Sequence, residues 1–194
     1  MAQGFWLTLG TLQASGGAIT AASRTSMTAS STQGRFTLPA NSLKNLGDQL
    51  LVEATGIISC VITTPGTARW DLAMATTAKM DTTAIPLNTV ARTNTPWCLR
   101  MLGSLTTAGT SAVLTWTGFV LSDAIVNTAL QATGPGPGGT ILPYSGTATG
   151  ASTASSSFDA TVSQLLDLYF TQTVATGSCT LQQLNMSILT ATGF

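Results

Sequence analysis

The sequence predicts an all-β protein, a jelly-roll-like two-sheet β-sandwich preceded by an extended N-terminal arm. From Arg35 onward, short segments rich in Val, Ile, Thr, Trp and Phe are separated by turn residues, a pattern typical of strands. Within several segments the large apolar residues occupy every second position, which places them on one face of a sheet. Residues 34–194 hold roughly eight to ten such segments, the number expected for a jelly roll or a related sandwich.

The first 33 residues differ from the rest and are expected to form the arm. A short apolar stretch, Phe5–Leu9, is followed by Gly, Ala, Ser and Thr from Ser15 to Gln33, with Arg24 as the single charge. Such a run cannot build a core of its own. We therefore divide the chain into an arm, residues 1–33, which we expect to lie on a neighbouring molecule, and a sandwich domain, residues 34–194. A linker or a disordered tail is the alternative.

The first large strands are expected between residues 50 and 74. Leu50–Ala54 and Ile57–Ile62 are almost continuously apolar or β-branched, and the second run leads to the turn pair at residues 65–66. These two runs are expected to pair with each other or to face each other across a core. Trp70–Met74 alternates between large apolar and smaller or polar residues, which predicts a half-buried strand.

Further strands are expected at Trp97–Met101, Val113–Leu121 and Leu166–Thr171. The last strand contains a change of phase. Cys179 and Leu181 share a face with Leu184, Met186 and Ile188 only if one extra residue is absorbed at Gln182-Gln183. This predicts a β-bulge there; the alternative is that two separate strands meet at this point.

One stretch favours a short helix. Ser122 is suited to cap a helix, Asp123 would lie in the first turn, and apolar residues from Ile125 to Leu130 recur at four-residue spacing before Gly134. The Gly-Pro run 134–139 and the polar run 145–157 are expected to be loops.

Three cysteines, Cys60, Cys98 and Cys179, are an odd number at wide spacing, with no CxxC pair. We expect buried free thiols in a reducing compartment.

Charged residues are scarce and histidine is absent. Lys and Arg total 7 and Asp and Glu total 7, so that 7% of the chain is charged against roughly a quarter in a usual globular protein. Histidine is the commonest metal ligand and general base, so we expect neither a metal nor another cofactor. The basic residues are scattered, which argues against nucleic acid as a partner. No run approaches the roughly 18 apolar residues of a membrane span, so a membrane is not expected as a partner either.

Aspartate pairs are the remaining candidates for catalysis. Asp71 with Asp81, or Asp159 with Asp167, would suit glycoside hydrolysis if the carboxyl groups faced each other about 5 to 10 Å apart. Nothing in the spacing indicates that they do. Asp71 and Asp167 fall on polar positions of alternating strands, where a carboxylate is expected to face solvent or an interface. We therefore predict no catalytic residue and no enzyme activity.

Aromatic residues divide into two groups. Trp70, Trp97 and Trp116 fall on the apolar positions of their strands and are expected in the core rather than on a sugar-binding platform. Trp6 lies in the arm, which has no core of its own. We therefore predict a partner-binding anchor in the arm, formed by Phe5, Trp6, Leu7 and Leu9.

Several stretches resemble virion proteins of tailed bacteriophages. They are FTLPANSL at 36–43, GDQLLVEATG at 47–56, WCLRM at 97–101, and SFDATVSQ at 157–164 with the following LDL at 166–168. The resemblance covers most of residues 35–189 and lies in strand and turn residues rather than in a catalytic signature.

The resemblance implies a jelly roll or related sandwich, commonly trimeric, that serves as a capsid cement or decoration protein or as a small head or tail appendage. It implies location in the virion, assembled in the host bacterial cytoplasm, with the major capsid protein and sister copies as partners. The scarcity of charge agrees with this role, because a surface of Thr, Ser and Ala costs little to desolvate in a subunit interface. An appendage that binds a host surface glycan through the loops at 134–139 and 145–157 is the alternative.

Overall fold

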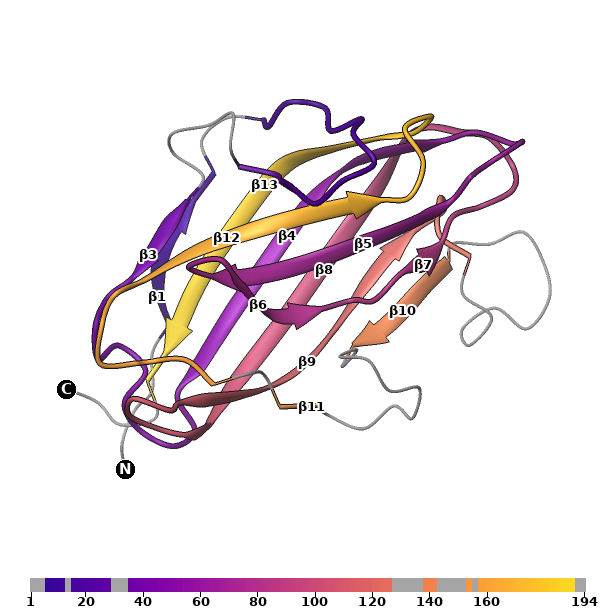
Figure 1. Ribbon diagram of the computed structural model, residues 1–194. Coiled ribbons are helices and arrows are strands. Elements are labelled where there is room, and N and C mark those ends of the chain that lie inside the picture. Colours follow the sequence, from indigo (N-terminus) through magenta and orange to yellow (C-terminus); the bar gives the residue numbers. More distant parts are fainter. Residues whose placement is uncertain are drawn as a thin grey trace.

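The computed structural model describes residues 6–12, 15–28, 35–126, 138–142, 153–154 and 157–190. These residues form two antiparallel sheets that pack face to face, as Figure 1 shows, which confirms the predicted all-β two-sheet sandwich. The jelly-roll character remains a prediction. No helix in the described part of the chain is long and apolar enough to cross a membrane.

The larger sheet has the strand order β1-β13-β4-β8-β9-β10, with β11 also paired to β9. Its long central strands are paired along nearly their whole length. The two apolar runs expected at 50–62 belong largely to one strand, β4, rather than to two. The strands of this sheet are β1 (Trp6–Thr11), β4 (Gln49–Cys60), β8 (Arg92–Thr107), β9 (Val113–Ser122), β10 (Gly138–Leu142), β11 (Thr153–Ala154) and β13 (Ser178–Leu189).

The smaller sheet has the order β2-β12-β5-β6, and β3 and β7 pair with β12 and β5. It covers one face of the larger sheet, in front of it in Figure 1. Its strands are β2 (Thr25–Ser26), β3 (Phe36–Leu38), β5 (Thr67–Met74), β6 (Thr77–Asp81), β7 (Ile85–Pro86) and β12 (Gln164–Gln172).

The core lies between the facing sides of the two sheets and is centred on aromatic rings. Trp70 on β5 lies 5.4 Å, between ring centroids, from Trp97 on β8, and 5.2 Å from Phe170 on β12. Trp116 is also buried. The prediction that these three tryptophans are core residues is confirmed, and the Trp70–Trp97 contact joins the two sheets.

The predicted β-bulge in the last strand is confirmed. The pairing of β13 with β4 shifts register between Leu181 and Gln183. The shift lets Cys179 and Leu181 share the buried side with the apolar residues that follow. Gly56 lies opposite Leu181, and a Cβ there would come within 2.0 Å of the Thr180 carbonyl oxygen.

The predicted helix after Ser122 is wrong for the described residues. Asp123 and Ala124 form a turn, and Ile125 makes a β-bridge with Leu87. The Val126 amide donates to the Pro86 carbonyl at 2.9 Å, so hydrogen bonds to a distant segment replace those of a local helix. Residues 127–137 lie outside the described part.

Two expected loops contain short strands. Residues 138–142 form β10 and residues 153–154 form β11, and both pair with β9. Glycines at 138 and 139 therefore occupy a strand rather than a loop, because β9 offers them an unpaired edge.

The described residues of segment 1–33 complete one side of the sandwich. β1 pairs with β13, and the chain then follows β13 through hydrogen bonds from Leu12 and Gly16 and a β-bridge at Ile19. β2 pairs with β12 in the other sheet. Within the chain this segment is therefore an edge of the sandwich, a correction to the expected separate arm, because the edges of β13 and β12 supply partners for its backbone. A contact between this segment and a neighbouring molecule stays a prediction.

Candidate functional surfaces

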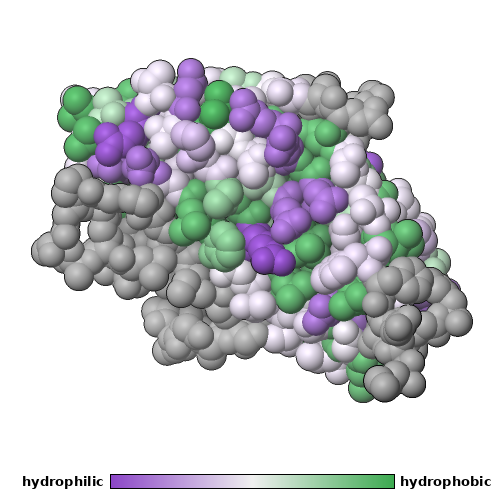
Figure 2. Space-filling model, turned by 180° about the vertical axis from the view of Figure 1, so that it is seen from behind, coloured by the Kyte–Doolittle hydropathy of each residue, from purple (hydrophilic) through white to green (hydrophobic). Residues whose placement is uncertain are grey.

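The larger sheet has one side that the smaller sheet does not cover, which we call the outer face. Strand pairing arranges its side chains in rows across β13, β4, β8 and β9. Figure 2 views the molecule from this side and shows apolar and polar residues intermingled around a hollow. The two central rows are Asn185, Glu53, Arg100 and Phe119, and Gln183, Thr55, Cys98 and Leu121.

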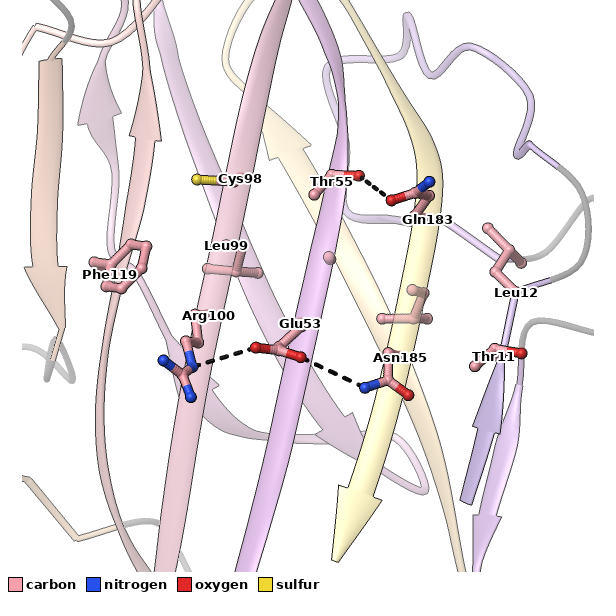
Figure 3. Close-up of a pocket in the computed structure, with 12 residues that line it drawn as sticks. Thr11, Leu12, Glu53, Thr55, Cys98, Leu99, Arg100, Phe119, Gln183 and Asn185 are labelled. Carbon is pink, nitrogen blue, oxygen red and sulfur yellow. Dashed lines mark hydrogen bonds and ion pairs between the residues drawn. The ribbon is translucent and has the colours of Figure 1, made fainter. Parts of the chain in front are cut away.

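Polar side chains on the outer face form a ladder between strands. Arg100 Nε lies 3.3 Å from Glu53 Oε1, and Asn185 Nδ2 donates to Glu53 Oε2 at 3.5 Å. In the neighbouring row, Thr55 Oγ1 donates to Gln183 Oε1 at 3.3 Å. Figure 3 shows both sets. The Arg100 and Glu53 side chains are 54% and 44% exposed, so their pairing contributes at most about 1 kcal/mol to stability.

A hollow of about 690 Å³ lies over this ladder. Phe119 on β9 borders it on one side, and Thr11 and Leu12, next to β13, border it on the other (Figure 3). A second hollow of about 480 Å³ adjoins it, because Thr55 and Cys98 line both and Leu121 lines the second. The outer face is thus a shallow, open surface with polar side chains across its middle, bordered by Phe119 on one side and by Thr11 and Leu12 on the other.

The uncovered side of the smaller sheet is occupied by ion pairs within the chain. Arg24 binds Asp71 through two nitrogens, with Nη2 2.5 Å from Oδ1 and Nε 3.0 Å from Oδ2. Its guanidinium also lies over the Tyr169 ring, 3.6 Å from the centroid. Arg69 pairs with Asp81 in the same way, its Nε 2.7 Å from Oδ1.

Asp167 is the other buried carboxylate on this side. It accepts hydrogen bonds from Ser26 Oγ at 2.8 Å and Thr28 Oγ1 at 2.7 Å, and it lies 3.3 Å from Arg35 Nε. Asp71 and Asp167 are 0% and 1% exposed. The expectation that they face solvent or an interface is therefore wrong, because Arg24, Arg35 and β2, which the sequence assigned to or beside the arm, fold back over them.

The candidate aspartate pairs have different outcomes. Asp71 and Asp81 are direct cross-strand neighbours on β5 and β6, which the sequence spacing did not indicate. Each is held by its own arginine. Asp159 instead accepts from the backbone amide and the hydroxyl of Thr161 within a turn. The arginine contacts join Asp71 to the N-terminal segment and Asp81 to β5, whereas the contacts of Asp159 stay within its own turn. Among the described residues no group of three or more Cys, Asp or Glu side chains gathers as a metal site.

Burial and neighbouring charges shift the pKa values of several groups near these surfaces. The pKa of Tyr169 is raised by burial and by the nearby Asp167 carboxylate. The pKa of Lys79 is lowered by burial, and its Nζ donates to the Ser157 carbonyl at 2.8 Å. Hydrogen bonds to the Asp71 carboxylate raise the pKa of Arg24, so the guanidinium stays protonated beside the buried aspartate.

The three cysteines are free, as expected, but they are not equally buried. Cys60 and Cys179 lie in the core, and burial raises the pKa of both thiols, most strongly for Cys179. Cys98 lies on the outer face and is only half-buried. The alternation of Trp97–Met101 accounts for this difference, because it places Cys98 opposite the buried Trp97 and Leu99.

Of the predicted partner-binding anchor, Phe5, Trp6, Leu7 and Leu9, the described residues differ in their exposure to solvent. Phe5 lies outside the described residues. Trp6 and Leu7, on β1, are 46% and 47% exposed, whereas Leu9 packs against the core. The strand β1 is the last on its side of the described sheet, so its outer edge has no strand partner among the described residues. As neighbours on this strand, Trp6 and Leu7 point to opposite faces of the sheet.

Comparison with known protein families, curated proteins and solved structures finds no match to this chain.

Proposed function

We propose that the chain is a structural virion protein, a trimeric cement or decoration protein that binds the outside of a phage capsid. It would contact the major capsid protein and stabilise the shell by bridging capsomers. The observation that carries the proposal is the outer face of the larger sheet, a broad uncovered surface that suits contact between subunits of an assembly, whereas the other face of the sandwich is closed by ion pairs. The resemblance of residues 35–189 to phage virion proteins supports the same role.

Multivalency would supply the affinity. Three sandwiches that each make a modest contact with the shell act as one ligand, because the first contact raises the effective concentration of the others. The exposed Trp6 and Leu7 on the edge strand suit such a contact: the strand edge pairs with backbone of a neighbour, and the two side chains fill pockets in it.

A variant with both Trp6→Ala and Leu7→Ala is expected to bind capsids at least tenfold more weakly while its thermal unfolding is little changed, because both side chains are half-exposed. Binding is measured as copies retained per purified particle over a concentration series. Ile62→Ala, at another exposed apolar side chain, is the control and should bind as the unmodified chain does. Equal retention by the double variant would remove Trp6 and Leu7 as anchors.

Point variants are preferable to deleting residues 1–33, since that deletion also removes β1, β2 and the buried Ile19 and Met27.

A glycan-binding appendage is the second candidate. The hollow favours it, because Glu53, Arg100 and Asn185 offer hydrogen-bonding groups beside the Phe119 ring, a combination that also suits a sugar. Labelling the protein in intact particles separates the two functions: many copies over the head support cement, and a few copies at the tail support an adhesin.

A further inference from the structure

We infer that copies of this chain associate through the outer face of the larger sheet. The half of the face formed by β8 and β9 of one copy lies against the half formed by β4 and β13 of the next. This surface would hold the proposed trimer together, so the inference rests on the proposed function and deepens it.

The outer face is large enough for a stable contact. Four strands about 4.8 Å apart and about ten residues long, at about 3.3 Å per residue, cover roughly 630 Å², so each half of the face presents about 320 Å². In a closed trimer each copy uses both halves, and the roughly 630 Å² that it covers in total approaches the roughly 800 Å² that each partner buries in a standard protein interface. The uncovered side of the smaller sheet offers no comparable surface, because its arginines and aspartates already bind one another.

Apolar side chains on the β8 and β9 half supply the anchors. Leu121 is 40% exposed, and Phe119 is partly exposed beside the hollow. The other half carries the hollow's opposite border, at Thr11 and Leu12, over a floor of amides and hydroxyls. Phe119 and Leu121 of one copy would fill this space in the next, and burying an aromatic and a leucine in a pocket is the usual source of affinity in an interface.

The charges of the face complement those of another copy. Along Gln49–Ile57, Pro96–Ser104, Thr115–Leu121 and Gln183–Leu189 the charged residues are Glu53 and Arg100 alone. Arg100 belongs to one half of the face and Glu53 to the other. When opposite halves meet in a closed ring, Arg100 of each copy faces Glu53 of the next. The face carries no net charge that would attract a strongly acidic or basic partner. A second copy, in contrast, presents one negative and one positive side chain that can pair with Arg100 and Glu53.

The Glu53–Arg100 pair within one copy does not prevent these side chains from pairing with those of a neighbouring copy. Both side chains are about half-exposed, so the pair is weak and opening it costs little. Arg100 approaches Glu53 through Nε, and a guanidinium has five N–H donors, so Arg100 can keep this contact while it binds a second carboxylate.

Sedimentation equilibrium of the purified chain tests the inference with Leu121→Asp and Phe119→Asp. The unmodified chain is expected to sediment as a trimer at micromolar concentration. Each variant is expected to raise the concentration of half-dissociation at least tenfold, because a buried unpaired carboxylate is placed in the contact. Leu165→Asp on β12 is the matched control, since Leu165 is 39% exposed but lies on the smaller sheet, and it should remain a trimer. Circular dichroism of each variant establishes that the sandwich is folded.

The outcomes separate the two proposals. If neither Leu121→Asp nor Phe119→Asp weakens the trimer, or if Leu165→Asp weakens it equally, the outer face is not the contact between copies. The proposed function is unaffected by either result. If the unmodified chain stays monomeric at tens of micromolar, the proposed trimer itself is wrong. This holds even if the monomer binds capsids, a result that would assign the outer face to contact with the shell.

Discussion

Replacing Trp70 by alanine is expected to lower the free energy of unfolding by about 3 to 5 kcal/mol, the cost usually found when a large buried aromatic is truncated. Trp70 is fully buried and touches Trp97 on the facing sheet and Phe170 on the neighbouring strand. Alanine would leave a cavity between the two sheets rather than at their margin. The strands that carry Trp70 and Trp97, β5 and β8, cannot move together to close such a cavity, because each is paired with a neighbouring strand on both of its sides.

Urea unfolding followed by tryptophan fluorescence and circular dichroism measures this change. Trp70→Phe keeps a ring in the same place and is expected to cost less than half as much, which keeps the test informative if the alanine variant fails to fold. Trp6→Ala, at an exposed tryptophan, is the control and should change stability by less than about 1 kcal/mol. A loss below about 1 kcal/mol for Trp70→Ala would contradict a core in which this side chain joins the sheets.

Replacing Arg24 by alanine is expected to lower the free energy of unfolding by about 2 kcal/mol. The substitution leaves the Asp71 carboxylate, which is 0% exposed, without its hydrogen bonds from the two guanidinium nitrogens Nε and Nη2. Breaking a buried ion pair from one side typically costs about 3 to 5 kcal/mol, and the smaller value applies because Arg24 is 37% exposed and water can enter where it lay.

Arg100→Ala, with both variants measured on the dissociated chain, provides the matched control, because within one chain the Arg100 and Glu53 side chains are both exposed and the loss of their pair is expected to cost less than about 1 kcal/mol. Adding Asp71→Asn to Arg24→Ala should recover part of the lost stability, since the uncompensated charge is then removed. Equal small losses for Arg24→Ala and Arg100→Ala would show that Arg24 does not fasten the N-terminal segment to the smaller sheet.

Local patterns in the sequence predicted the strands and the sides they present. The alternation at Trp97–Met101 correctly placed the tryptophan in the core, and the change of phase at Gln182-Gln183 correctly located the bulge. Both features are properties of a single strand, whose period of two is fixed by the backbone. They can be read without knowing which strands are neighbours.

Features that depend on distant segments could not be read in this way. The polar position of Asp71 suggested solvent, but Arg24, 47 residues earlier, covers it. Ile125 lies at a spacing typical of a helix, but its backbone forms a β-bridge with Leu87 instead. A signal for the Asp71–Asp81 neighbourhood was present, since two alternating segments flank the short stretch Ala75-Thr76, which is the form of a hairpin. The outer face itself emerges only once four strands are placed in register.

The accessibility of Cys98 tests most directly whether neighbouring copies cover the outer face. Cys98 lies on that face beside the hollow, while Cys60 and Cys179 are buried and the raised pKa of each thiol slows its reaction further. The measurement is the rate of iodoacetamide alkylation at each cysteine of the unmodified chain, over a dilution series that spans dissociation. If neighbouring copies cover the outer face, the Cys98 rate rises at least tenfold on dilution while the rates of Cys60 and Cys179 stay slow. A Cys98 rate that is equally fast at every concentration, in a chain that sediments as an oligomer, would contradict a covered outer face.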